Sequence, residues 1–142
     1  MKVKDAMRRE VVTVDEEDSV MEASRRMREK HEGCAVVLRG GKPVGMVTER
    51  DVTWKVAGNG LDPKAVKVKE IMSVPLITID PDADFLEAAR LMCKNRIRRL
   101  AVVKDHIVYG VITAAEIASN LEGYMDLEIR KILKAAFFPF PH

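Results

Sequence analysis

Two short motifs place a threonine three residues before an acid, directly after an apolar run. The first is Thr48-Glu49-Arg50-Asp51 and the second is Thr113-Ala114-Ala115-Glu116. A threonine that opens a helix offers its hydroxyl and the free backbone N–H groups of the first turn to an anion. A carboxylate one turn later can accept two hydrogen bonds from a vicinal diol. Both motifs therefore carry groups that could bind a ligand.

The same spacing is also that of a helix capping box, in which the acid binds the backbone N–H of the threonine. Glu116 has the length that this box prefers, whereas the shorter Asp51 is expected to close it less well. Asp51 is thus the better candidate for a ligand-binding acid, and Glu116 is more easily explained as a cap.

The motifs recur because the chain contains a repeat of 65 residues. In that register residues 3–56 align with residues 68–121 without a gap, and 12 of the 54 aligned positions are identical. The identities include Met7 with Met72 and Gly45 with Gly110. Two copies predict a pseudo-twofold pair in which each half covers the apolar face of the other.

Each copy is predicted to fold as β-α-β-β-α. The first helix begins after Ser19 or Asp84, with Glu22 or Glu87 completing a capping box, and the last helix begins after each motif threonine. Near-continuous apolar runs predict strands buried on both faces. The expected strands are residues 11–14, 35–38 and 44–47 in the first copy and residues 76–79, 100–103 and 109–112 in the second.

The predicted domains are residues 1–60 and 61–122, followed by a C-terminal helix and tail at residues 123–142. In the tail, apolar residues at helical spacing end before a segment rich in proline.

Composition excludes several classes of protein. The formal net charge is only +2, which predicts no general affinity for nucleic acid or for anionic membranes. No apolar run approaches the roughly 20 residues that span a bilayer, and the charged N-terminus lacks the apolar stretch of a secretory signal. We therefore expect a cytoplasmic protein. No nucleophile–base pair, metal-ligand spacing or Gly-rich loop with lysine is present, so we expect no catalytic residues, no metal and no enzyme activity.

The two copies resemble CBS domains, whose tandem pair is often called a Bateman module. The residues that carry the resemblance are Met7 and Met72, the segment 43–52, and its partner segments 98–103 and 109–117. The resemblance implies an α/β (α+β) fold of two β-α-β-β-α repeats packed as a pseudo-twofold pair, here with an added C-terminal helix. It also implies a regulatory, energy-sensing module that binds an adenine nucleotide without catalysis, AMP first and then ATP or ADP.

In this family each cleft combines the Thr/Asp motif of one copy with the first two strands of the other. By this resemblance Arg99 would bind phosphate in the first cleft, whereas Cys34 occupies its place in the second, which is expected to be weaker and to contain no arginine. The ligand residues expected in the first cleft are Thr48, Arg50, Asp51, Ile77, Thr78, Arg98, Arg99 and Leu100. Those expected in the second cleft are Val12, Thr13, Cys34, Ala35, Thr113 and Glu116.

A second hypothesis is a nucleic-acid-binding or structural interaction module that uses the same fold. Basic clusters at residues 25–30 and 94–99 favour it. The near-neutral charge and an aromatic content of only 5% argue against it, because readers of single strands stack bases on aromatic rings. We expect the partners to be an adenine nucleotide, a second copy in a homodimer and an unidentified effector protein, with neither nucleic acid nor membrane among them.

Overall fold

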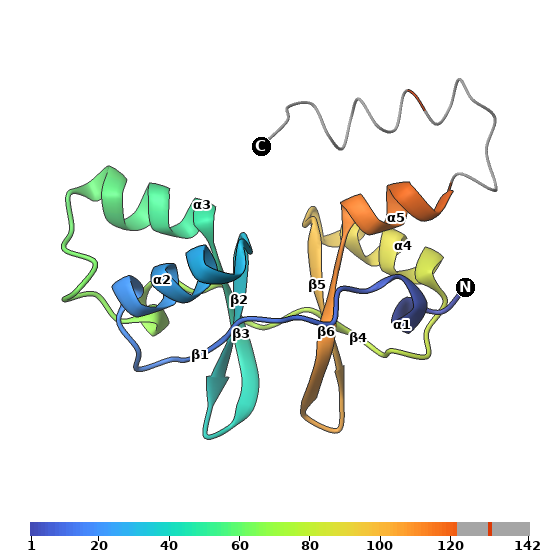
Figure 1. Ribbon diagram of the computed structural model, residues 1–142, viewed down its shortest axis with the longest axis horizontal. Helices are drawn as coiled ribbons and strands as arrows, with labels where there is room; N and C mark the ends of the chain where they lie inside the picture. The colour runs from blue at the N-terminus through green and yellow to red at the C-terminus, as the bar shows by residue number, and fades with distance from the viewer. Residues whose placement is uncertain (122–130, 132–142) are drawn as a thin grey trace. The chain divides into compact units, whose positions relative to one another are not determined.

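The computed structural model describes residues 1–121 and Lys131, and the chain divides into two compact units (Figure 1). The N-unit contains Glu10–Ile77 together with Asp105–Val108. Of the described residues, the C-unit contains Met1–Arg9, Thr78–Lys104 and residues 109–121. Each unit has one mixed three-stranded sheet with its two main helices on a single face (Figure 1). The fold class is therefore α/β, as the sequence predicts.

The N-unit follows the predicted β-α-β-β-α order. Its sheet has the order β1-β2-β3, with β1 parallel to β2 and β2 antiparallel to β3. The last helix begins as α3 and continues through a π-helical turn and a 3₁₀ turn to a left-handed Gly60. The elements are β1 Thr13–Asp15, α2 Val20–Lys30, β2 Cys34–Arg39, β3 Lys42–Thr48, α3 Glu49–Asp51, the π-helical turn Val52–Val56, and the 3₁₀ turns Ala57–Asn59 and Val68–Glu70.

The C-unit repeats this order, with β4 parallel to β5 in a sheet of order β4-β5-β6. It also carries a short helix at the start of the chain. Its elements are α1 Val3–Ala6, β4 Thr78–Ile79, α4 Phe85–Asn95, β5 Arg99–Lys104, β6 Ile107–Thr113 and α5 Ala114–Asn120. The hairpin strands extend past their predicted ends, whereas β1 and β4 begin two residues later than predicted.

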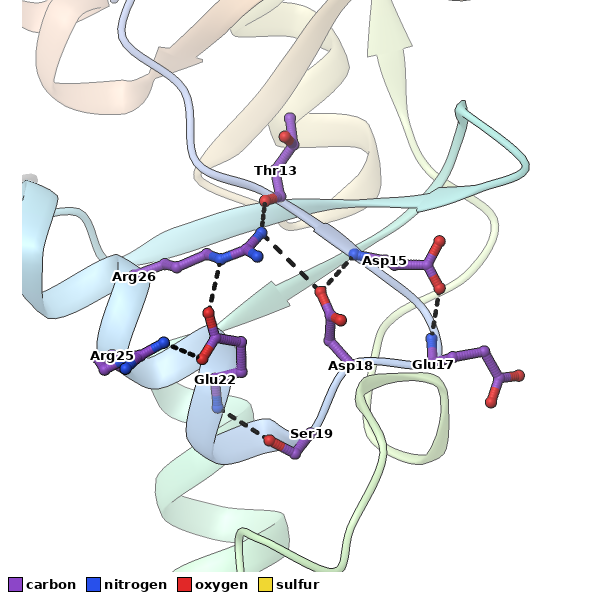
Figure 2. Close-up of polar contacts among 8 residues, drawn as sticks. All are labelled: Thr13, Asp15, Glu17, Asp18, Ser19, Glu22, Arg25 and Arg26. Atoms are coloured by element: carbon purple, nitrogen blue, oxygen red, sulfur yellow. Dashed lines mark hydrogen bonds and ion pairs between the residues drawn. The ribbon is translucent and has the colours of Figure 1, made fainter.

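Side-chain caps fix where the first helix of each unit begins. Ser19 Oγ accepts from the Glu22 backbone N–H at 3.0 Å, and Asp84 Oδ1 accepts from the Leu86 N–H at 2.8 Å. The second half of the predicted capping box differs, because the Glu22 carboxylate instead holds Arg25 and Arg26 one turn along the helix (Figure 2). The predicted helix starts are thus right, but at α2 the box is half formed.

The first helix of each unit packs an apolar face into the core of that unit. Val20, Ala23 and Met27 of α2 are buried, as are their counterparts in α4. The hairpin strands carry four consecutive buried residues in β2 and three in β5, which agrees with strands buried on both faces. The core of the N-unit contains Val12, Val14, Val20, Ala23, Met27, Ala35, Val37, Val47, Val56, Val68 and Ile71.

The segment that opens each repeat packs in the unit formed by the body of the other repeat. Val3 N donates to Ala83 O at 2.8 Å in the C-unit, and the equivalent Val68 N donates to Asp18 O at 2.9 Å in the N-unit. From these contacts the chain continues to the last strand of each sheet through residues 7–9 and 71–73, which pair with β6 and β3. We call these two stretches the crossing segments. The compact units therefore do not coincide with the sequence repeats.

The C-terminal helix expected at residues 123–142 lies outside the described residues, apart from Lys131. Within the part of the chain that the structure describes, no helix is long and apolar enough to cross a membrane.

Candidate functional site

A glycine in the last strand of each sheet lets a crossing segment pass against it. A Cβ atom added to Gly45 would lie 2.8 Å from the Ser73 carbonyl oxygen, and one added to Gly110 would lie still closer to the Arg8 carbonyl oxygen. Paired backbone hydrogen bonds hold each contact, including Ser73 N to Met46 O at 2.8 Å. The glycine of each Gly-x-x-Thr motif is therefore required by backbone packing three residues before the threonine.

Thr48 and Asp51 form a closed capping box at the junction of β3 and α3. The Thr48 backbone N–H and its hydroxyl donate to Asp51 Oδ2 at 2.9 and 3.2 Å. In return, the Asp51 N–H donates to Thr48 Oγ1 at 3.3 Å. The expectation that aspartate closes the box less well is wrong, because the short side chain reaches the Thr48 N–H at an ordinary hydrogen-bond distance.

Asp51 is nevertheless an unusual capping residue, because it is a buried carboxylate with only 8% of its surface exposed. Burying an unpaired charge is costly, so a buried carboxylate requires a counter-ion. Lys55, one turn further along the helix, supplies it with Nζ 3.0 Å from Asp51 Oδ1. Arg50 lies outside this network, with its guanidinium carbon 4.0 Å from the centre of the exposed Trp54 ring.

Thr113 and Glu116 repeat the box at the junction of β6 and α5. Glu116 Oε2 accepts from the Thr113 N–H at 3.1 Å and also from its hydroxyl. Its other oxygen lies 3.6 Å from Arg8 Nε, in the crossing segment of the same unit. The sequence argument expected no arginine at this second motif, and the fold corrects it by bringing Arg8 there from the start of the chain.

The remaining residues predicted for the first ligand site are divided between the two units. Leu100 is fully buried in β5, Arg99 is half-buried at the start of that strand, and Arg98 is exposed just before it. Thr78 is exposed in β4, while Ile77 belongs to the N-unit together with Thr48 and Asp51.

The residues predicted for the second site lie at the start of β2 and beside β1. Cys34 and Ala35 are buried in β2. The Thr13 carbonyl accepts from Arg26 NH1 at 3.0 Å, which ties β1 to α2 (Figure 2). An open hollow of about 230 Å³ lies along this seam, lined by Val11, Val12, Thr13, Arg26, Glu29 and Lys30.

Sequence reasoning missed Lys55 and Arg8, the two cations that neutralise the motif acids. Neither is identical in the other copy, since Lys55 aligns with Asn120 and Arg8 with Ser73. The available signal was charge spacing, because Asp51 and Lys55 are four residues apart on a predicted helix. Among the described residues, no group of three His, Cys, Asp or Glu side chains is placed to hold a metal ion.

Comparison with known families decides what this duplicated unit is. The family model described as "CBS domain" matches residues 3–58 and again residues 68–123. The chain belongs to the CBS-domain family. One relative, the CBS domain-containing protein YhcV of Bacillus subtilis, is 31% identical over 118 residues, covering 83% of this chain and 84% of the relative.

Solved structures show the same CBS-pair fold. A hexameric CBS-CP12 protein from bloom-forming cyanobacteria aligns with a TM-score of 0.80 and 33% identity, over 96% of this chain and 82% of that one. The CBS domain pair of protein MJ0100, solved in complex with 5′-methylthioadenosine and S-adenosyl-L-methionine, aligns with a TM-score of 0.77 and 28% identity. That alignment covers 88% of this chain and 98% of the MJ0100 pair.

Proposed function

We propose that this chain is a regulatory CBS pair that binds an adenine nucleotide, AMP in preference to ATP or ADP, and performs no chemistry on it. Both ligands of the MJ0100 pair contain an adenosine group. The group that the N-unit could offer to such a ligand is the Asp51 carboxylate, which can accept from ribose hydroxyls. The buried position of Asp51 beside Thr48 is the observation that carries the proposal.

The proposed roles follow the chemistry of each side chain. The Thr48 hydroxyl would bind a phosphate and Asp51 would bind the ribose. Arg99 is proposed as the second phosphate ligand, because a guanidinium matches paired phosphate oxygens. A capping box alone accounts for Glu116, and we propose that the Thr113 motif binds nucleotide weakly or not at all.

A ligand screen tests the proposal directly. The native protein is titrated with AMP, ADP, ATP, NAD, S-adenosylmethionine and a short RNA, and unfolding is followed by heating. A ligand that binds only the folded state adds about 2.7 kcal/mol of stability at 100 times its Kd, so its melting temperature rises. We expect the largest rise with AMP. A rise with RNA alone, weakening steeply with salt, would instead support the nucleic-acid module.

Three matched carboxylate-to-amide variants assign the ligand to one motif. Asp51→Asn keeps an acceptor for the Thr48 N–H but loses the charge, so AMP binding should weaken by about 1.5–3 kcal/mol. Glu116→Gln makes the same change at the other motif. Asp105→Asn is the control, because Asp105 is exposed and asparagine tolerates its φ of 51° equally well. Equal binding by Asp51→Asn and the native protein would limit Asp51 to capping.

We further propose that the module acts as a homodimer, with the cytoplasm as its compartment and a separate effector protein as its output. Closed twofold assembly is the commonest form of oligomer. The related CBS-CP12 protein is described as hexameric, so assembly occurs among similar chains. Light scattering should give about twice the chain mass of 16.0 kDa, and a monomer at micromolar concentration would contradict the homodimer.

A further inference from the structure

One lysine joins the motif acid of the N-unit to its crossing segment. Lys55 Nζ lies 3.0 Å from Asp51 Oδ1 and also donates to the Ile71 carbonyl at 2.8 Å. Two residues after Ile71, Ser73 exchanges two backbone hydrogen bonds with Met46 of β3. A change in the position of the Lys55 ammonium would therefore affect both the Asp51 carboxylate and the crossing segment that packs on the sheet.

The acceptor positions of Asp51 are nearly all in use. A carboxylate offers about four lone-pair positions on its two oxygens. Oδ2 accepts from the Thr48 N–H and hydroxyl, and Oδ1 accepts from Lys55. One position remains, whereas a ribose diol donates two hydrogen bonds. A diol can bind Asp51 through both hydroxyls only if one of the present donors leaves.

Lys55 is the donor that leaves at least cost. Its side chain is 48% exposed, so its ammonium can return to water, and the two hydrogen bonds of a diol would replace it at the buried carboxylate. The Thr48 N–H belongs to the capping box, and losing that bond would unpair a helix terminus. The Thr48 hydroxyl can leave Asp51 when it turns to a phosphate, so it is with adenosine, which has no phosphate, that Lys55 is the donor that must leave.

We propose that Lys55 is a displaceable counter-ion of Asp51. A ligand with a vicinal diol takes Oδ1 from Lys55, and the hold of Lys55 on the Ile71 carbonyl changes with it. This inference rests on the proposed nucleotide function and adds a specificity determinant to it. In the native protein, Lys55 pairs with the Asp51 charge until a ligand with a ribose diol binds. A 2′-deoxynucleotide has a single hydroxyl on the sugar and does not need to displace the lysine.

The C-unit reaches a similar arrangement with a different residue. There the cation beside the acid is Arg8, which belongs to the crossing segment itself, and the position of Lys55 is taken by Asn120. Asn120 donates to the Glu116 main-chain carbonyl at 2.7 Å and not to its carboxylate. In both units a cation thus connects the motif acid to the crossing segment. In the N-unit this cation is the half-exposed Lys55, which is not itself part of the crossing segment.

The test compares AMP with 2′-deoxy-AMP and adenosine by calorimetry on the native protein and the Lys55→Met variant. Without the competing ammonium, adenosine should bind about two- to fivefold tighter, the range that a partly exposed ion pair supports. AMP should gain less, because its phosphate can already take the Thr48 hydroxyl from Asp51, and 2′-deoxy-AMP should change little. Lys55→Arg keeps a cation and should stay near the native values. Lys42→Met removes an exposed hairpin lysine and is the control for net charge.

Hydrogen exchange distinguishes a lysine that the ligand displaces from a lysine with a purely structural role. Adenosine should speed exchange at the Ser73 amide of the native protein, whereas neither adenosine on Lys55→Met nor 2′-deoxy-AMP should have this effect. Weaker AMP binding by Lys55→Met with adenosine unchanged would make Lys55 a phosphate ligand and overturn the proposal. Equal changes for adenosine and 2′-deoxy-AMP would also overturn it. Failure of the native protein to bind any of the three would overturn the nucleotide function itself.

Discussion

The Arg8 carbonyl oxygen lies so close to Gly110 that the glycine has no room for a Cβ atom. At the equivalent position a Cβ on Gly45 would lie 2.8 Å from the Ser73 carbonyl. Both obstacles are backbone atoms held by paired hydrogen bonds, so neither can move without breaking the contact between the crossing segment and the sheet. These two glycines are needed for packing, although both lie within the motif that identifies the family.

Gly110→Ala and Gly45→Ala should therefore destabilise the protein, the former more strongly. Overpacking of this kind costs about 1–3 kcal/mol, and the shorter approach at Gly110 predicts a value at the upper end. Urea unfolding of the two variants measures the difference. Met7 Sδ is also close to Gly110, at 2.9 Å from the added Cβ. If Met7→Ala in the same chain restored stability, the flexible side chain and not the backbone would be the cause.

Ser24 carries a buried hydroxyl that has no hydrogen-bond partner within the described part of the chain. Its counterpart in the other copy is Ala89, so the fold itself shows that alanine suits this helix face. Ser24→Ala removes an unsatisfied polar group and favours the helix, and it should raise the free energy of unfolding by about 0.5–2 kcal/mol. Thermal unfolding measures the change.

Ser19→Ala is the matched control in the same helix. Ser19 accepts from the Glu22 N–H at the start of α2, so its loss should lower stability by about 1 kcal/mol. The two serine-to-alanine changes should thus have opposite signs. A loss of stability in Ser24→Ala would mean that its hydroxyl is bonded in solution.

Glu17 links the loop before α2 to the segment that opens the second repeat. Lys67 Nζ and Lys69 Nζ each lie 2.7 Å from one of its carboxylate oxygens, and they lower the pKa of Glu17 from its ordinary value of 4.5 to about 2. In the unfolded chain Glu17 binds a proton near pH 4.5, but in the folded protein only near pH 2. Its contribution to stability is therefore full above about pH 4.5 and is lost as pH falls towards 2.

Glu17→Gln should accordingly be less stable than the native protein at neutral pH, and the two unfolding midpoints should converge between pH 4.5 and 2. The group is exposed, so high salt should also reduce the difference. Unfolding midpoints measured across that pH range at low and high salt test both statements. A difference that stayed constant with pH would show that the ion pairs do not form in solution.

Local features of the sequence were sufficient to predict the order of elements in each unit. Ser19 and Asp84 mark the starts of α2 and α4 because side-chain caps act within three residues, and the apolar runs of β2 and β5 are buried as their composition requires. These features depend on neighbours in the sequence, and so they can be recognised without the fold.

Features that depend on contacts between distant segments were not predicted. The packing of Met1–Arg9 in the C-unit depends on where the chain returns after a long connection, and no local pattern encodes it. A signal did exist, because Met7 and Met72 are repeated along with Gly45 and Gly110, and each methionine lies beside the glycine of its own unit. Lys55 and Arg8, in contrast, are not repeated. They pair with the two motif acids from positions that do not align, so comparing the copies could not identify them.

The two motifs should differ in affinity, and each chain should bind one nucleotide tightly. Asp51 has the shorter side chain, whereas Glu116 is one methylene longer, so its carboxylate would crowd a ribose. The first motif is also proposed to work with Arg99, whose counterpart for the second motif is the uncharged, buried Cys34. An arginine–phosphate pair and a carboxylate–diol pair together contribute several kcal/mol, and only about 1.4 kcal/mol is needed for a tenfold difference in Kd.

Calorimetric titration of AMP should therefore give a stoichiometry near one per chain. Arg99→Ala should weaken binding at least tenfold by removing the charge that meets phosphate, whereas Glu116→Ala should leave the tight site nearly unchanged. Because Glu116 caps α5, the stability of Glu116→Ala is measured alongside, and a loss of about 1 kcal/mol is expected from the cap alone. Two equal sites per chain would contradict the asymmetry. Loss of binding in Glu116→Ala with Arg99→Ala unaffected would assign the tight site to the Thr113 motif instead.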